Sequence, residues 1–154
     1  NQGVKISLHQ SEEEDATRDG MDIALCAFNK EMTQLEYSAA NRPIWIIRSE
    51  NNKEVFEIKA TKVAIGGFTA DDQEFAVHTI ELKKGDSIYI FSDGYADQFS
   101  AEGKKMMTKK FKEILVSIQD KPMKEQKEFL NSYVDNWRGT AEQVDDVCVI
   151  GIKV

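Results

Sequence analysis

The sequence predicts an α+β fold in which helices cover antiparallel strands. Short apolar or alternating stretches, separated by turn residues, occupy most of the first 92 residues. Two later segments carry apolar residues at helical spacing, and a last apolar run closes the chain. Strands followed by two helices and a further strand are typical of layered α+β domains. The length of 154 residues suits one domain with its own core.

Four strands are expected in the first 58 residues, because the apolar runs there are bounded by polar turns. The first, Met21–Phe28, is largely apolar and suits a buried strand. The other three are shorter and span residues 34–39, 44–48 and 55–58. Consecutive hairpins of this kind indicate an antiparallel meander.

Three further strands are expected later in the chain. Residues 61–72 are expected to form a loop, after which the alternating stretch 75–82 predicts a strand. The turn Lys84-Gly85-Asp86 separates that strand from another at 87–92. The nearly continuous apolar run 147–154 predicts the last strand.

Two helices are expected before that last strand. Apolar residues recur at helical spacing over residues 106–118. A second helix is expected to begin near Pro122, since proline suits a first turn, and to end at Gly139. Residues 1–18 are polar and are expected to be a lead-in, with a short helix end and a partly disordered loop, before the domain over residues 19–154.

The composition argues against several function classes. The chain has 27 acidic and 20 basic residues, whereas nonspecific nucleic-acid binders carry a basic excess. Two cysteines inside apolar runs and only two histidines argue against a structural zinc site and favour reduced thiols. No apolar run approaches the roughly 20 residues that a membrane span needs, and no signal peptide is visible. We therefore expect a cytoplasmic segment without nucleic-acid or membrane contact.

Two short motifs place carboxylates at the ends of expected strands. In residues 91–97 a strand ends at Asp93, and Gly94 lets the backbone turn sharply after it. Asp145 and Asp146 stand just before the last strand, where adjacent carboxylates repel unless they are solvated, hydrogen-bonded or metal-bound. If these strand tips meet, they form an oxygen-rich site that suits Mg²⁺ or Mn²⁺. Ordinary turn and cap roles fit the same residues, so the spacing leaves both interpretations open.

Five motifs, taken in order, resemble the C-terminal part of a stage II sporulation protein E type serine phosphatase, within the bacterial metal-dependent protein phosphatase (2C-like) family. The resemblance is collinear from about Asp19 to Val154. The five motifs are Ser38-Ala39-Ala40-Asn41-Arg42-Pro43, Ala64-Ile65-Gly66, Leu82-Lys83-Lys84-Gly85-Asp86, Phe91-Ser92-Asp93-Gly94-Tyr95-Ala96-Asp97 and Val144-Asp145-Asp146-Val147.

The resemblance implies an α/β/β/α sandwich of two antiparallel sheets flanked by helices, with its N-terminal part missing from this chain. It also implies hydrolysis of phosphoserine or phosphothreonine on a regulatory protein, by a water that bridges two Mn²⁺ or Mg²⁺ ions. The partners implied are a phosphorylated regulator, such as an antagonist of an anti-sigma factor, and upstream sensor domains in the full-length chain.

Site residues follow from the resemblance position by position. Asp93 and Asp145 match metal-binding aspartates, and Asp146 is a supporting candidate beside them. Gly94 matches the glycine that permits the turn after Asp93. Asp97 falls where the family commonly has an acidic residue, although a helix cap explains it equally well.

Three further positions carry weaker expectations. Asn41 stands where the bacterial group often has histidine, which argues against proton chemistry there. Asp22 lies in a short motif that either forms a turn leading into a strand or places a carboxylate near the metal edge. Gly66 matches a loop glycine with a structural role.

One family motif has no counterpart in this chain. The family needs an upstream aspartate, followed by a glycine-rich turn, that bridges both metals, and residues 1–18 do not contain it. We therefore expect an incomplete, inactive site in a chain that belongs to a longer protein. The alternatives are a non-catalytic pseudophosphatase that binds a phosphoprotein or partner, and a truncated sandwich whose unpaired strand edge drives self-association.

Overall fold

The computed structural model describes residues 2–7 and 19–154, which divide into two compact units. Unit 1 comprises residues 1–44 and 58–82, and unit 2 comprises residues 45–57 and 83–154. The loop expected within residues 8–18 lies outside the described residues.

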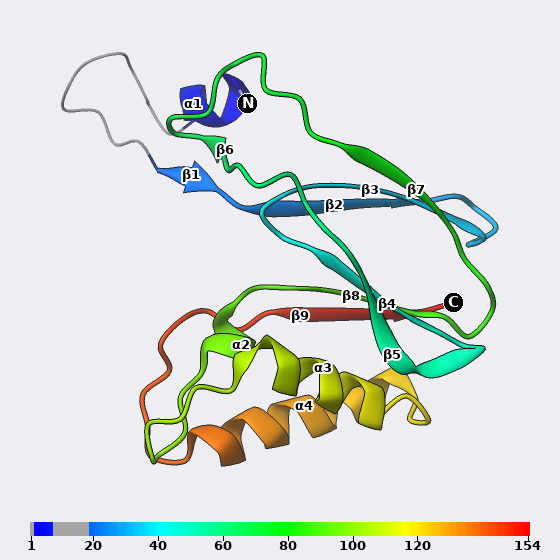
Figure 1. The fold of residues 1–154 in the computed structure, drawn as a ribbon, viewed down its shortest axis with the longest axis vertical. Helices are drawn as coiled ribbons and strands as arrows, with labels where there is room; N and C mark the ends of the chain where they lie inside the picture. Colours follow the sequence, from blue (N-terminus) through cyan, green and yellow to red (C-terminus); the bar gives the residue numbers. More distant parts are fainter. Residues whose placement is uncertain (1, 8–18) are drawn as a thin grey trace. The chain divides into compact units, whose positions relative to one another are not determined.

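Unit 1 contains a three-stranded antiparallel sheet in the order β2-β3-β7 and a small two-stranded sheet of β1 and β6 (Figure 1). The short helix α1 contacts β6. The elements of this unit are α1 (Gln2–Ser7), β1 (Gly20–Met21), β2 (Ile23–Phe28), β3 (Gln34–Ala40), β6 (Ile65–Gly66) and β7 (Val77–Glu81).

The first expected strand is divided and only partly buried, which corrects the prediction for residues 21–28. Asp22 separates β1 from β2, and the Leu25 side chain is 65% exposed. The cause is position, because β2 is an outer strand of its sheet and Leu25 shares an open face with Val77 of β7. The alternation in β3 does follow the prediction, with Leu35 and Tyr37 buried.

Unit 2 holds a four-stranded sheet in the order β5-β4-β8-β9, with helices α3 and α4 on one face (Figure 1). Only the terminal residues Ile44 and Ile58 of β4 and β5 fall in unit 1. The elements are β4 (Ile44–Arg48), β5 (Asn51–Ile58), β8 (Ser87–Phe91), α2 (Gly94–Asp97), α3 (Met107–Ser117), α4 (Met123–Arg138) and β9 (Val149–Lys153).

The core of unit 2 lies between its sheet and its helices. Phe111 of α3 is fully buried and packs against Trp45 and Tyr95, with ring centroids 5.3 Å and 4.3 Å away. Both expected helices are confirmed. Pro122 is the N-cap of α4, and Gly139 ends it with a positive φ of 54°.

The expected single meander is wrong. β3 and β4 follow one another in sequence but lie in different sheets, since β3 pairs with β7 and β4 with β8. The link between them contains Asn41, whose φ of 59° turns the chain out of the first sheet. Two separate sheets agree with the family fold that the motifs implied. The four-residue helix α2 was not expected.

A buried carboxylate anchors the start of β8. The Asp86 side chain is fully buried, and it accepts hydrogen bonds from the backbone N–H groups of Ser49 (2.8 Å) and Lys83 (3.0 Å). Arg48 completes the set with an ion pair at 2.8 Å. Gly85 turns before it with φ 91°, and a Cβ there would lie 3.0 Å from the Ser49 Cβ. The Lys84-Gly85-Asp86 turn therefore attaches the start of β8 to the end of β4 through the side chain of Asp86.

Asp86→Asn should destabilise the protein in a pH-dependent way. Burial alone would raise the pKa of Asp86, but the N–H donors of Ser49 and Lys83 and the Arg48 guanidinium outweigh it and lower the pKa. The carboxylate therefore contributes stability above its unfolded pKa of about 3.9, and this is lost as the pH falls through the folded pKa. We expect a loss of about 3 kcal/mol at pH 7, measured by urea denaturation.

The same comparison at pH 3 should show a smaller difference between Asp86→Asn and the wild type. Glu50→Gln is the control, because the Glu50–Lys83 ion pair is exposed and should leave the urea midpoint unchanged. A pH-independent difference for Asp86→Asn would contradict the assignment.

Candidate metal centre

Asp93 lies at the end of β8, where the chain turns into α2. It occupies the N-cap position of α2 with helical backbone angles, and its carbonyl accepts the Asp97 N–H at 2.9 Å. Its side chain forms no capping hydrogen bond and is half-buried. The carboxylate therefore stands at a strand tip, as the sequence indicated, without serving the helix as a cap.

The loop of Asp145 and Asp146 lies beside this turn because β9 pairs with β8. Phe91 and Val149 form the last pair of the ladder. Beyond it, the Ser92 N–H donates to the Cys148 carbonyl at 3.0 Å, and the Ser92 hydroxyl donates to the Asp146 carbonyl at 2.6 Å. Ser92 and Asp146 are 54 residues apart in sequence. Their hydrogen bond thus brings the two carboxylate-bearing segments together in unit 2.

Gly94 is needed because the two loops touch. A Cβ at this position would lie 2.4 Å from the Asp146 carbonyl oxygen and 3.2 Å from that of Asp145. Gly94 does not have a positive φ, so a left-handed backbone does not explain why glycine is needed at this position. Close approach of the Asp146 backbone is the reason, which corrects the sequence interpretation.

Asp145 and Asp146 both have exposed side chains. One carboxylate oxygen of Asp145, Oδ1, accepts the Asp146 N–H at 2.7 Å, and Gln143 donates to the Asp145 carbonyl at 2.9 Å. These bonds fix the turn and leave Asp145 Oδ2 outside them. An exposed carboxylate oxygen at this point can bind a cation.

Asp97 has a different environment from the other candidates. It lies within α2, and Asp93 rather than Asp97 holds the N-cap position, so the expectation of a cap at Asp97 is wrong. Its carboxylate forms an ion pair with Lys105 at 3.0 Å.

Asp22 and Asn41 meet each other in unit 1. Asp22 follows β1, and its two carboxylate oxygens accept hydrogen bonds from Asn41 Nδ2 at 2.8 Å and Arg42 Nη2 at 2.7 Å. Asp22 is therefore neutralised by an ion pair to Arg42. Nothing in the local sequence pattern around Asp22 indicates this contact with Asn41 and Arg42. Gly66 is buried with φ 83°, in keeping with a structural role.

The donor chemistry fits part of a hard-cation site. Carboxylate oxygens are the ligands that Mg²⁺ and Mn²⁺ prefer, and Mg²⁺ commonly uses one or two carboxylates with several waters. Across residues 2–7 and 19–154, no group of three or more His, Cys, Asp or Glu side chains is arranged to hold a metal ion. Asp93 and Asp145 fit such an ion in kind, and they would supply only part of its coordination.

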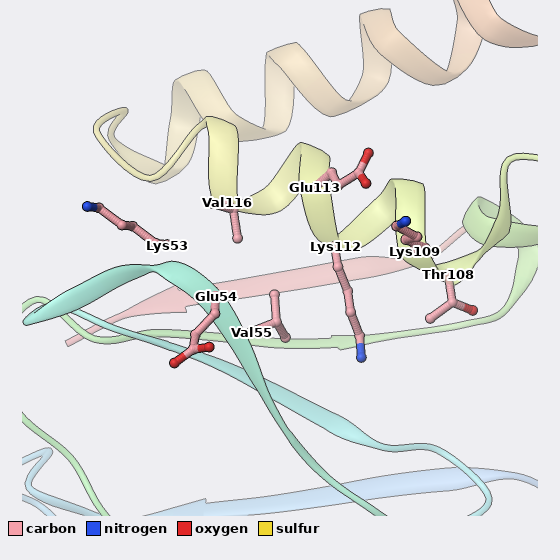
Figure 2. Close-up of a pocket in the computed structure, with 8 residues that line it drawn as sticks. All are labelled: Lys53, Glu54, Val55, Thr108, Lys109, Lys112, Glu113 and Val116. Atoms are coloured by element: carbon pink, nitrogen blue, oxygen red, sulfur yellow. The ribbon is translucent and has the colours of Figure 1, made fainter.

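A separate groove of about 420 Å³ lies between β5 and α3 (Figure 2). Val55 and Val116 line it together with lysine and glutamate side chains, and it shares no residue with the two carboxylate loops. Lys112 is held there by an ion pair to Glu57 at 2.8 Å and lies 4.9 Å from the Trp45 ring centroid. The lining of this groove carries three lysines and two glutamates, and no aspartate, cysteine or histidine.

Gly94→Ala should loosen the carboxylate loops. The added methyl group would overlap the Asp146 carbonyl, so the backbone must move, at a cost of about 1–3 kcal/mol. We expect a lower thermal midpoint and faster amide hydrogen exchange at residues 145–148. Gly3→Ala is the control, because nothing lies within 4 Å of a Cβ there. An unchanged midpoint and unchanged exchange in Gly94→Ala would show that the loops do not depend on this contact.

Comparison with solved structures finds the same fold. The SiaA-PP2C domain of Pseudomonas aeruginosa is similar with a TM-score of 0.76 and 23% identity, over 86% of this chain and 51% of that one. The phosphatase domain of SpoIIE from Bacillus subtilis, presoaked with Mn, has a TM-score of 0.60 and 16% identity, over 99% of this chain and 72% of that one. The catalytic domain of the serine/threonine phosphatase PstP, in complex with two manganese ions, has a TM-score of 0.64 and 16% identity. The match covers 97% of this chain and 64% of that one.

This chain spans about half the length of the SiaA-PP2C domain. No curated protein sequence matches it significantly. The family model of stage II sporulation protein E matches residues 4–154, which includes all of the motifs that carried the resemblance. The chain therefore belongs to the stage II sporulation protein E family, and its fold is that of PP2C-type phosphatase domains.

Proposed function

We propose that this chain supplies part of the metal centre of a phosphatase that removes phosphate from phosphoserine or phosphothreonine on a regulatory protein in bacterial signalling. The observation that carries the proposal is the contact between the Asp93 turn and the loop of Asp145 and Asp146. Membership of the stage II sporulation protein E family supports the reaction type.

Asp93 and Asp145 are the proposed metal ligands, and Asp146 adds negative charge beside them. Mn²⁺ or Mg²⁺, two in the complete domain, would lower the pKa of a coordinated water and neutralise charge on the phosphoryl oxygens. The manganese ions in the PstP structure support this choice of metal. The task of the chain itself is to hold its carboxylates in place and to present them to solvent.

Asn41 has no proton role in this proposal. Its amide does not titrate near neutral pH, and its side chain donates a hydrogen bond to Asp22. The reaction consumes one water and releases inorganic phosphate and the free hydroxyl group of the substrate. A proton needed by the leaving oxygen must come from elsewhere than Asn41.

The proposed setting is the cytoplasm, where a phosphorylated regulator of sigma-factor activity would be the substrate and sensor domains would precede this segment. The sequence composition, with only two cysteines, supports this setting. No helix in the described part of the chain is long and apolar enough to cross a membrane.

A second candidate is a pseudophosphatase that binds a phosphoprotein without hydrolysing it. The absence of a three-residue ligand group within the described ranges favours it, as does Asn41 in place of histidine. It differs from the enzyme in one measurable respect, because it predicts binding of a phosphorylated partner without turnover.

Asp93→Asn and Asp145→Asn should each lower phosphatase turnover in the full-length protein by about 100-fold or more, because each removes a charged metal ligand. The assay uses Mn²⁺ and a chromogenic phosphate ester. Asp120→Asn is the matched control, since Asp120 is exposed beyond the end of α3 and should leave turnover unchanged.

Two outcomes would contradict the proposal. Equal turnover in the wild type and Asp93→Asn would remove Asp93 from the metal centre. A wild-type protein that lacks turnover with Mn²⁺ and Mg²⁺, yet binds a phosphorylated partner, would support the pseudophosphatase instead.

A further inference from the structure

The Ser92 side chain makes two short hydrogen bonds to the backbone of the facing segment, and its hydroxyl also has a longer contact of 3.5 Å with the Cys148 carbonyl. Its hydroxyl donates to the Asp146 carbonyl at 2.6 Å and accepts the Cys148 N–H at 2.9 Å. Its own N–H donates to the Cys148 carbonyl at 3.0 Å. A serine hydroxyl has one proton to donate, and here that proton is used on Asp146.

These bonds continue the pairing of β8 and β9 past its last residue pair, Phe91 and Val149. Beyond this pair, the segment that follows β8 leads to Asp93, and the segment that precedes β9 comes from Asp145. The Ser92 hydroxyl bonds two backbone groups that lie two residues apart on the same segment, so it fixes the direction in which that segment enters β9. It thereby holds the Asp146 carbonyl against Gly94.

The Asp145 carboxylate bonds only within its own loop among the hydrogen bonds given above, through the Asp146 N–H. Asp93 and Asp145 carry the same charge and repel each other until a cation is bound. The segment of Asp145 has no regular secondary structure and is exposed, so its position depends on the few bonds that it makes. Metal binding requires ligands held within about 0.5 Å of the productive geometry.

We propose that Ser92 is a positioning residue that presets the spacing of the Asp93 and Asp145 loops for divalent-cation binding. This inference rests on the proposed metal centre and adds a determinant of its affinity. Ser92 is not a ligand in this account, because its hydroxyl already bonds the backbone of Asp146 and Cys148.

Mn²⁺ titration of the full-length protein, followed by electron paramagnetic resonance of the free ion, tests the inference without relying on activity. Ser92→Ala should raise the Kd for Mn²⁺ by about tenfold or more, the range found when groups that orient metal ligands are removed. Ser92→Thr keeps the hydroxyl and should stay within about threefold of the wild type.

Ser117→Ala is the matched control. The Ser117 hydroxyl makes the same kind of bond, to the Ile114 carbonyl at 2.7 Å, but it lies at the end of α3. Its loss should affect stability without changing the Kd for Mn²⁺. A second readout needs no metal, because the amide hydrogen of Cys148 loses its acceptor in Ser92→Ala and should exchange faster than in the wild type.

The outcomes separate this inference from the proposed function. A folded Ser92→Ala protein with wild-type Mn²⁺ affinity would overturn the role of Ser92 while leaving the metal centre intact. A wild-type protein that binds no Mn²⁺ would overturn the metal centre and this role with it. If Ser92→Ala does not fold, Ser92→Cys replaces it, and its Kd should exceed that of Ser92→Thr; equal values would contradict the inference.

Discussion

The pairing of β8 with β9 is the contact on which the candidate site depends. β8 delivers Asp93 at its end, and β9 begins just after Asp145 and Asp146. Because antiparallel neighbours place the end of one strand beside the start of the other, residues more than 50 positions apart in sequence meet at one sheet end. Any change that separates these two strands would also separate the carboxylates.

The rest of unit 2 holds β8 in position from its two ends. At its start, the buried Asp86 carboxylate binds the backbone of Ser49 and Lys83 and pairs with Arg48. At its end, the Ser92 hydroxyl and the bare Cα of Gly94 allow the two loops to close on each other. Between these points the sheet packs against α3 and α4 through an aromatic core around Phe111. The Asp93 side of the candidate site thus follows a strand that is bonded at both ends, whereas Asp145 lies in an exposed loop that this strand orients.

Much of this unit was predictable because its signals are local. Helical spacing, Pro122 and Gly139 gave α4 nearly to the residue, and the family motifs placed Asp93 and Asp145 at strand tips. The errors concern long-range partners. Local alternation does not say which strand pairs with which, so β3 and β4 were expected in one meander although they belong to different sheets. Nor does it reveal that Ser92 bonds Asp146, or that Asp22 pairs with Arg42.

In the proposed metal centre, Asp93 and Asp145 bind the same pair of divalent cations. The most direct measurement is a crystal structure of the full-length protein soaked with Mn²⁺, with an anomalous difference map calculated at the manganese edge. We expect a peak at the junction of β8 and β9, with carboxylate oxygens of both Asp93 and Asp145 at roughly 2 Å from manganese or joined to it by one water. Manganese bound elsewhere in the protein, with neither carboxylate near it, would show that Asp93 and Asp145 do not form the metal centre.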